Sequence, residues 1–218
     1  MQKIKKPLFP IVMILSGVIA GILISSIIFA FTGFSVFGGA HRSTISAEDA
    51  RSADMTMLAY DVLRHIRDDD FIAFSRVVHP EFGVVFSPSA TINLSTDRRF
   101  NSDQVATLNT DTVTYVWGVY NGSGEPIELT PPEYFNEFVP ASRHLDSPIV
   151  GINHIIRSGN ALENIKDVFP DVRFVDFHVP GGGGEMSEEF DWSSLRLGFE
   201  EYDGSLWLTV IVHSTWTD

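Results

Sequence analysis

A general base that works near neutral pH is most often a histidine beside an oriented carboxylate, and the chain offers one such arrangement. Asp176 and His178 are two residues apart in a run where apolar and polar residues alternate. In a strand, both side chains therefore point to one face, opposite their apolar neighbours. His79 and His213 are further candidate polar groups, at the ends of predicted elements. Our candidates for a catalytic site are His79, Asp176, His178 and His213.

The same pattern also fits residues that have only a structural role, and we favour that interpretation. The face that carries Asp176 and His178 is then simply exposed to solvent, and His79 and His213 form hydrogen bonds at the ends of elements. Ligand binding is a separate hypothesis, because aromatic side chains can form the walls of a pocket, although in strands they mostly fill cores. Our candidates for a ligand-binding site are Tyr115, Trp117, Arg196 and Trp207.

Metal and cofactor sites are not expected. The chain has no cysteine, and its seven histidines include no pair at the i, i+4 spacing of a helical zinc site. Asp68, Asp69 and Asp70 are consecutive and lack the alternating spacing of a calcium loop. We therefore predict no metal ligands and no cofactor.

One long apolar segment determines where the chain is located. From Leu8 to Phe37 there is no charged residue. A helix needs about 20 apolar residues to cross a hydrocarbon core of roughly 30 Å. We therefore predict a transmembrane helix over residues 8–32, with the lipid bilayer as its partner.

The flanking charges predict the orientation of this helix. Lys3, Lys5 and Lys6 precede it, and basic residues are retained on the cytoplasmic side. We expect a cytoplasmic tail over 1–7, a tether over 33–45 and an extracytoplasmic domain over 46–218. The alternative is a signal peptide cleaved after Ala40, which we consider weaker because the apolar run is about twice the usual 7–15 residues.

The exported part is strongly acidic. Residues after 40 contain all 28 acidic residues but only 12 of the 15 lysines and arginines, a formal charge of −16. Such a field repels nucleic acid, so we expect no nucleic-acid partner.

Periodicity predicts helices first and strands afterwards. Ser46 begins a helix of about 20 residues with apolar positions at helical spacing, and Asp70 can cap a shorter one. Further short helices are expected over 103–108, 130–138 and 161–168. Strands are expected over 84–86, 91–94, 113–120, 127–129, 149–156 and 172–179. The alternating runs on both sides of Asp203-Gly204 predict a final β-hairpin.

This order gives an α+β domain in which one curved, mostly antiparallel sheet packs on N-terminal helices. Three segments carry a more specific resemblance: Val78-His79-Pro80 through Pro88, Trp117-Gly118 through Ile127, and Asp191-Trp192-Ser193-Ser194 through Thr217. On these segments, residues 52–218 resemble the NTF2-like (cystatin-like) cone, and in particular a family of membrane-anchored extracytoplasmic domains of bacteria. The resemblance implies a cone-shaped fold and assigns no activity to any residue.

Three functions follow as hypotheses, of which a ligand sensor that signals through the N-terminal tail is the least favoured, because only six residues precede Pro7. The first is a non-catalytic binding or assembly module of the cell envelope, with an envelope protein as partner, because the short tether holds the domain close to the membrane. The second is an enzyme that uses a His/Asp general base in the pocket of the cone, on a small molecule or a cell-wall fragment. A cone filled by aromatic side chains would favour the first, and an open pocket with histidine and carboxylate at its floor would favour the second.

Overall fold

The structure is a computed structural model that describes residues 46–147, 149–182 and 190–216. The predicted tail, transmembrane helix and tether, at 1–7, 8–32 and 33–45, lie outside the described residues. Within the described ranges, no helix has the length and apolar character needed to cross a bilayer.

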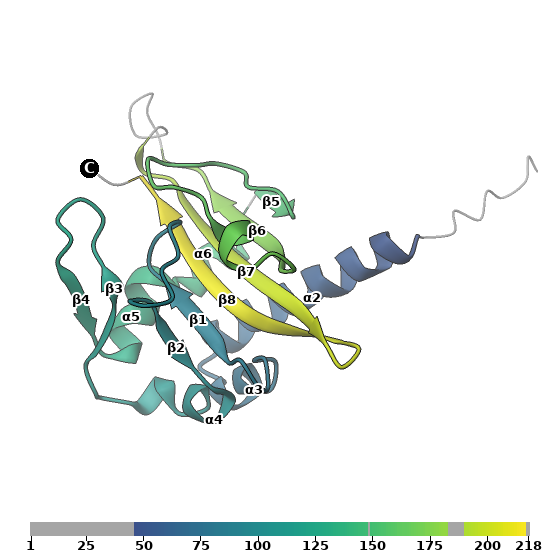
Figure 1. Ribbon diagram of the computed structural model, residues 1–218, viewed down its shortest axis with the longest axis horizontal. Coiled ribbons are helices and arrows are strands. Elements are labelled where there is room, and N and C mark those ends of the chain that lie inside the picture. The colour runs from purple at the N-terminus through teal and green to yellow at the C-terminus, as the bar shows by residue number, and fades with distance from the viewer. Residues whose placement is uncertain (1–45, 148, 183–189, 217–218) are drawn as a thin grey trace, which may run out of the picture. The chain divides into compact units, whose positions relative to one another are not determined.

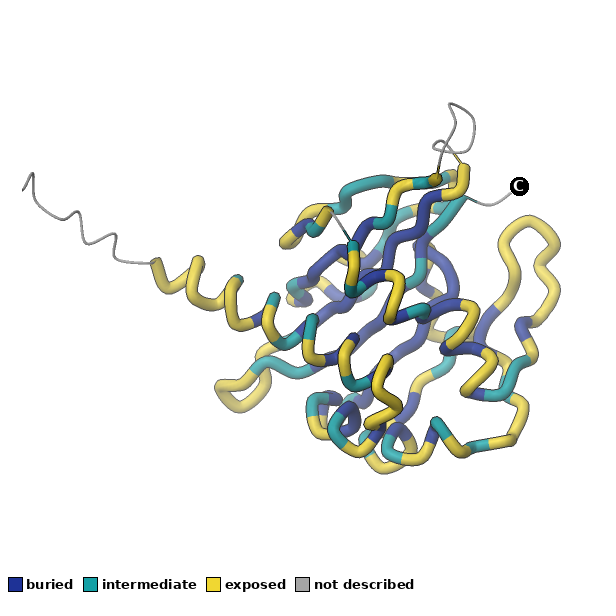
Figure 2. Tube along the Cα trace, turned by 180° about the vertical axis from the view of Figure 1, so that it is seen from behind, coloured by how far each residue is buried: buried dark blue, intermediate teal, exposed yellow. Residues whose placement is uncertain are grey.

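The first described element is the long helix α2 (Ala47–Arg67), which begins where the sequence predicts. Ser46 is its N-cap and accepts a hydrogen bond from the Asp49 N–H, and Glu48 and Asp49 lie in the first turn, where the helix dipole favours negative charge. Asp70 then caps α3 (Phe71–Ser75) by accepting from the Ala73 N–H. Figure 2 shows α2 lying across the buried strands of the sheet.

The main sheet has six strands in the order β2-β1-β8-β7-β6-β5. Its members are β1 (Val84–Ser87), β2 (Arg98–Phe100), β5 (Ile149–Ile152), β6 (Arg173–Val179), β7 (Ser193–Tyr202) and β8 (Ser205–Thr215). Only the β1/β8 pair is parallel, and the other pairs are antiparallel. The described domain is therefore α+β with a mixed, mostly antiparallel sheet (Figure 1).

The predicted hairpin forms the centre of this sheet. Strands β7 and β8 join through Asp203 and Gly204, which have φ angles of 51° and 74°. Two successive positive φ angles are typical of the hairpin turn whose twist matches that of the flanking strands. Because these strands occupy the middle of the sheet, side chains on both of their faces are buried.

Helices and a second, two-stranded sheet cover one face of the main sheet. The helices are α5 (Pro131–Phe138) and α6 (Ala141–Leu145) with α2 and α3, and the small sheet pairs β3 (Tyr115–Val119) with β4 (Pro126–Leu129). The larger core cluster lies here, and it is rich in aromatic residues. Trp117 stacks on Tyr134 with ring centroids 3.8 Å apart, and Phe86 contacts both rings edge-on. We call this the helix side.

The opposite face, which we call the outer side, is covered by the segment 153–172 with its short helix α7 (Ile165–Val168). A smaller cluster packs here, built on Phe169, Phe174 and Val210. Gly198 permits the close approach, because a Cβ atom there would meet Val210 Cγ1 at 2.6 Å and Val172 Cγ2 at 2.8 Å. The face that carries Asp176 is therefore buried, and our expectation that it is exposed to solvent is wrong.

Several local predictions are also corrected. Residues 91–94 form no strand, because the Asn93 side chain accepts from the N–H and hydroxyl of Ser95 and closes a local turn. The predicted strand 149–156 ends at Ile152, before Asn153 with its φ of 50°. The predicted helix 161–168 is only α7, and the predicted helix 103–108 is α4 (Ser102–Val105) followed by the 3-10 turn η1 (Leu108–Thr110). Strand β2 and helix α6 were not predicted from the sequence.

Candidate functional site

Asp176 and Arg196 lie directly opposite each other on β6 and β7, and both are fully buried on the outer side. The Asp176 carboxylate accepts from Arg196 Nε at 3.3 Å and from the Ile156 N–H at 2.9 Å. Arg196 Nη1 donates to Glu163 Oε2 at 2.5 Å, and its Nη2 donates to the carbonyl of Arg157 at 3.1 Å. We call Asp176, Arg196 and Glu163 the outer cluster.

The outer cluster has two carboxylates for one guanidinium. Asp176 Oδ1 and Glu163 Oε1 are buried and have no hydrogen-bond partner among the described residues. Burial raises the pKa of the Glu163 carboxyl, and the nearby Arg196 only partly opposes that shift. The cluster therefore orders the segment 153–163 on the sheet, because Arg196 and Asp176 both bind its backbone.

A second polar cluster lies on the helix side. Ser193 Oγ on β7 is 3.1 Å from His144 Nε2 on α6 and 3.2 Å from His213 Nε2 on β8. The other ring nitrogen of His144 lies 3.1 Å from the carbonyl of Pro140. We call His144, Ser193 and His213 the helix-side cluster.

The partners in this cluster determine the direction of each hydrogen bond. The Pro140 carbonyl can only accept, so we assign the proton of neutral His144 to Nδ1. His144 Nε2 then accepts from the Ser193 hydroxyl, and the same hydroxyl oxygen accepts from His213 Nε2–H. His213 Nδ1 is buried and has no hydrogen-bond partner among the described residues.

Burial keeps these histidines neutral. It lowers the pKa of His213 to about 4, with the nearby His144 adding to the shift, and it lowers the pKa of His144 as well. The arrangement of a serine between two imidazoles resembles a nucleophile with its base, but Ser193 is only 4% exposed and His144 is fully buried. A substrate has no access to this hydroxyl in the described structure.

The predicted Asp176/His178 pair shares a face, as its spacing indicates, but it does not form a catalytic pair. His178 Nδ1 lies 2.9 Å from Ser194 Oγ, whereas the Asp176 carboxylate binds Arg196 and the backbone of Ile156. Burial lowers the pKa of His178, which opposes the effect of Asp176. Neither residue lines the five main surface hollows of the described residues.

The remaining predicted site residues are dispersed. His79 accepts at Nδ1 from the N–H groups of Glu81 and Phe82, so it closes a turn. Trp117 is fully buried and donates to the carbonyl of Leu129. Tyr115 is half-buried and donates to Asp111, and Trp207 donates to the Tyr202 carbonyl beside a different hollow. The structure does not bring these residues together with Arg196.

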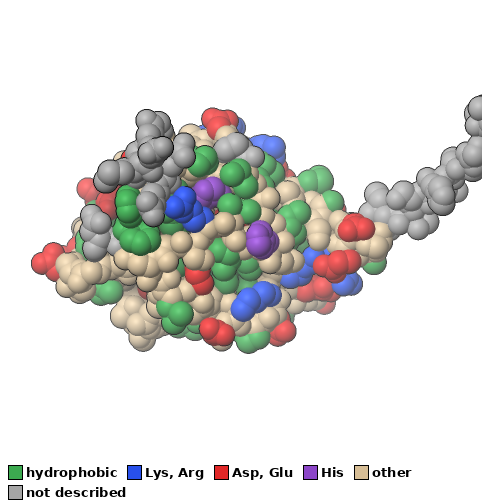
Figure 3. Space-filling model, turned by 90° about the horizontal axis from the view of Figure 1, so that it is seen from above, with side chains coloured by type: hydrophobic (Ala, Val, Ile, Leu, Met, Phe, Trp, Pro, Cys, Tyr) green, Lys and Arg blue, Asp and Glu red, His purple; other side chains and the backbone are tan. Residues whose placement is uncertain are grey.

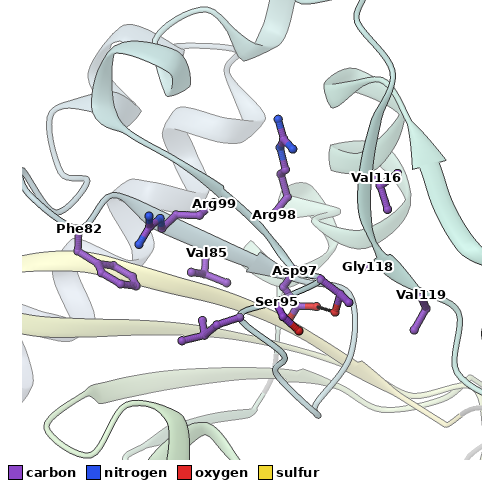
Figure 4. A pocket seen from close by; sticks show the side chains of 11 residues that line it. Phe82, Val85, Ser95, Asp97, Arg98, Arg99, Val116, Gly118 and Val119 are labelled. Atoms are coloured by element: carbon purple, nitrogen blue, oxygen red, sulfur yellow. Dashed lines mark hydrogen bonds between the residues drawn. The ribbon is translucent and has the colours of Figure 1, made fainter.

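The largest of the five hollows lies at the end of the main sheet, between β2 and β3. It has a volume of about 600 Å³, whereas the other four have 320–420 Å³. It is lined by Phe82, Val85, residues 94–99, Val116, Gly118 and Val119. We call this hollow the β2–β3 groove (Figure 4).

The wall of the β2–β3 groove combines exposed apolar groups with two cations. Leu94, Val116 and Val119 are 52%, 45% and 42% exposed, which is unusual for three aliphatic side chains around one hollow. Arg98 and Arg99 are adjacent on β2, and Figure 4 shows them leaving the strand in different directions. This combination suits a ligand that is partly apolar and partly anionic.

Sequence reasoning missed the residues that form these sites. His144 and Glu163 each contact residues more than 30 positions away, at Ser193 and Arg196, and no local pattern indicates such pairs. Arg98 and Arg99 do carry a signal, because two adjacent cations are conspicuous in a strongly acidic domain.

Comparison of the chain with protein-family models gave no match. Comparisons with curated proteins and with solved structures also gave no match. The functional argument therefore depends on the geometry of the described residues.

Proposed function

We propose that the chain is a single-pass membrane protein whose exported domain is a non-catalytic binding or assembly module of the cell envelope. The apolar segment 8–32 and the lysines before it support the anchor and its orientation. The order of helices first and a long hairpin last supports an NTF2-like cone for the domain.

One observation carries the binding proposal: the core between the sheet and the helices is filled, and the largest of the five hollows is at the sheet edge. Trp117, Tyr134 and Phe86 occupy the centre of the helix side and are each at most 1% exposed. The histidines and the serine of the helix-side cluster bind one another and line none of the five surface hollows. The β2–β3 groove, in contrast, presents unpaired groups to a partner.

The anchor and orientation can be tested with single cysteines, because the chain has none of its own. A membrane-impermeant maleimide is applied to whole cells that express Gln2→Cys or Met57→Cys. Met57 is 65% exposed on α2, so its variant is expected to react in intact cells, whereas the Gln2 variant is expected to react only after permeabilisation. Reaction of both variants, or of the Gln2 variant alone, would contradict the proposed topology.

The binding role can be tested by photo-crosslinking in membranes of the cell that encodes the chain. A benzophenone side chain is placed at Val116 in the β2–β3 groove or at the control position Leu162, which is 70% exposed on the outer side. We expect one discrete protein adduct from Val116, identified by mass spectrometry, and no adduct of that mass from Leu162. Equal, diffuse labelling from both positions would argue against a specific module.

A further inference from the structure

The partner chemistry of the β2–β3 groove can be inferred from its two arginines, and this step depends on the proposed binding function. We propose that the groove binds an extended peptide segment with two consecutive acidic residues, which adds as a strand to the free edge of β2. The occupant is a segment of a partner protein, recognised by charge, by backbone pairing and by aliphatic side chains.

The first argument is the state of the two guanidinium groups. Four arginines of the described residues have carboxylate partners, among them Arg64 with Asp61 and Arg173 with Glu48, whereas exposed arginines such as Arg51 and Arg76 have none. In the described ranges, Arg98 and Arg99 form no ion pair, although the part of the chain after residue 40 has a formal charge of −16. Arg98 Nε is also buried without a hydrogen-bond acceptor there. A buried charged donor without an acceptor is unfavourable, so Arg98 gains a hydrogen bond if a carboxylate binds beside it.

The second argument is that both cations are held in place. Arg98 lies 4.5 Å above the Tyr115 ring and 5.3 Å from the Phe100 ring. Arg99 lies 4.9 Å above the Phe82 ring. Stacked guanidinium groups lose little further freedom when they bind a carboxylate, so the groove is organised before its ligand arrives.

The third argument concerns the backbone. Strand β2 is at the end of the six-stranded order and pairs only with β1. An end strand presents N–H and C=O groups that an extended peptide can pair with. Strand β3 is on the other side of the groove, and in the described residues it pairs only with β4. A peptide in the groove therefore meets a strand edge and an apolar wall.

The positions of the arginines specify the ligand sequence. Adjacent residues of a strand point to opposite faces, so Arg98 and Arg99 offer one cation on each face of β2. Side chains that lie opposite each other on neighbouring strands interact, so two consecutive acidic residues place one carboxylate beside each arginine. Flanking aliphatic residues would then cover Val116 and Val119. The Asp97 carboxylate also lines the groove, but it accepts from the Asn93 N–H and so is engaged in its own loop.

The test uses the full chain in lipid nanodiscs and a fluorescein-labelled peptide, Thr-Val-Thr-Glu-Glu-Val-Thr-Val, with binding followed by fluorescence anisotropy at low salt. A matched peptide has Gln-Gln in place of Glu-Glu. We expect the amide peptide to bind on the order of tenfold more weakly, because its side chains carry no charge. Equal binding of the two peptides would overturn the proposal.

Protein variants locate the site. Arg98→Gln with Arg99→Gln is expected to weaken binding of the acidic peptide on the order of tenfold or more. The control, Arg51→Gln with Arg76→Gln, removes the same charge from exposed positions outside the groove and is expected to bind within about twofold of the wild type. Equal losses in both double variants would show only a long-range effect of charge and would overturn the proposed site. Near-UV circular dichroism checks that both variants are folded.

A third peptide separates strand addition from simple charge attraction. N-methylation of alternate backbone nitrogens removes donors and keeps both carboxylates, and we expect a loss of at least about fivefold for one of the two methylation patterns. Unchanged binding of both methylated peptides would overturn strand addition. If Val116 crosslinks a single envelope protein and the acidic peptide does not bind, the inferred ligand chemistry is wrong and the binding function stands. If the peptide binds and Val116 captures nothing in cells, the proposed function is the part that fails.

Discussion

The two faces of strand β7 carry polar clusters that differ in charge: one is ionic and the other is neutral. On the outer side, Arg196 joins two carboxyl groups, so that cluster consists of ionisable groups. On the helix side, Ser193 joins two neutral imidazoles. The clusters start from positions only three apart in the sequence, yet they are built by different chemistry.

The difference reflects the segments that cover the two faces of the sheet. The helices on one side satisfy most of their backbone groups internally, so a neutral hydrogen-bonded chain of side chains is enough to fix α6 against the strands. The segment 153–163 has no regular secondary structure and leaves backbone groups to be satisfied, and Arg196 and Asp176 bind two of them directly. We therefore expect the outer cluster to fail abruptly when its cation is removed, and the helix-side cluster to respond gradually to pH.

The largest expected effect comes from removing the cation of the outer cluster. Arg196→Met keeps an unbranched side chain of similar length but leaves Asp176 buried with no counter-ion. We expect a loss of about 3–5 kcal/mol in the free energy of unfolding, since one partner of a buried pair is removed. Urea unfolding followed by tryptophan fluorescence measures it.

Two further variants sharpen this result. Arg64→Met breaks the Arg64–Asp61 pair, whose side chains are each 51% exposed, and is expected to cost less than about 1 kcal/mol. Combining Arg196→Met with Asp176→Asn and Glu163→Gln removes all three charges and is expected to recover part of the loss. If Arg196→Met costs no more than Arg64→Met, the outer cluster is not a buried ionic unit.

The pH response of the helix-side cluster is the second largest effect. The pKa of His213 is about 4 in the folded chain against 6.5 for the free side chain. Below pH 6.5 the unfolded chain therefore binds a proton that the folded chain refuses, so stability falls as the pH decreases from 6.5 towards 4. This one group contributes a loss of about 3 kcal/mol across that window.

The variant His213→Gln isolates this contribution. Its amide can still donate to Ser193 but does not titrate in this range. Urea unfolding of both proteins at pH 7.0, 5.5 and 4.5 is expected to show a smaller decline for the variant. Parallel declines in the two proteins would mean that His213 is not the source of the pH dependence.

Local patterns in the sequence predicted the elements, whereas contacts between distant segments formed the clusters. The cap at Ser46, the turn at Asp203-Gly204 and the shared face of Asp176 and His178 follow from spacings of a few residues. The burial of that face could not be predicted, because it depends on how the segment 153–172 folds over the sheet. Contacts between distant residues hold this segment: the Asn164 side chain forms hydrogen bonds with both the N–H and the carbonyl of Ile92, 72 positions away.

The third effect compares the two adjacent serines of β7, one on each face. Ser193→Ala removes the hydroxyl that joins His144 and His213, so two buried ring nitrogens lose their partner, and we expect a loss of about 1–3 kcal/mol. Ser194→Ala breaks only the bond to His178 and is expected to cost about 1 kcal/mol. Thermal unfolding of both variants at pH 7 measures the difference. A larger loss for Ser194→Ala would show that the helix-side chain contributes little.

The smallest expected effect comes from Glu163→Gln, at the solvent side of the outer cluster. Burial raises the pKa of Glu163 more than Arg196 lowers it, so the ionised carboxylate is disfavoured where it lies. The amide oxygen of glutamine can still accept from Arg196 Nη1, and the substitution leaves one carboxylate, Asp176, for one guanidinium. The two changes oppose each other, and we expect the free energy of unfolding to change by less than about 1 kcal/mol at pH 7. Because the folded pKa is raised, any gain is expected to grow as the pH rises above the ordinary value of 4.5 and to level off above the folded pKa, and urea unfolding over a pH series measures it. A loss comparable to that of Arg196→Met would mean that Glu163, rather than Asp176, is the main counter-ion of Arg196.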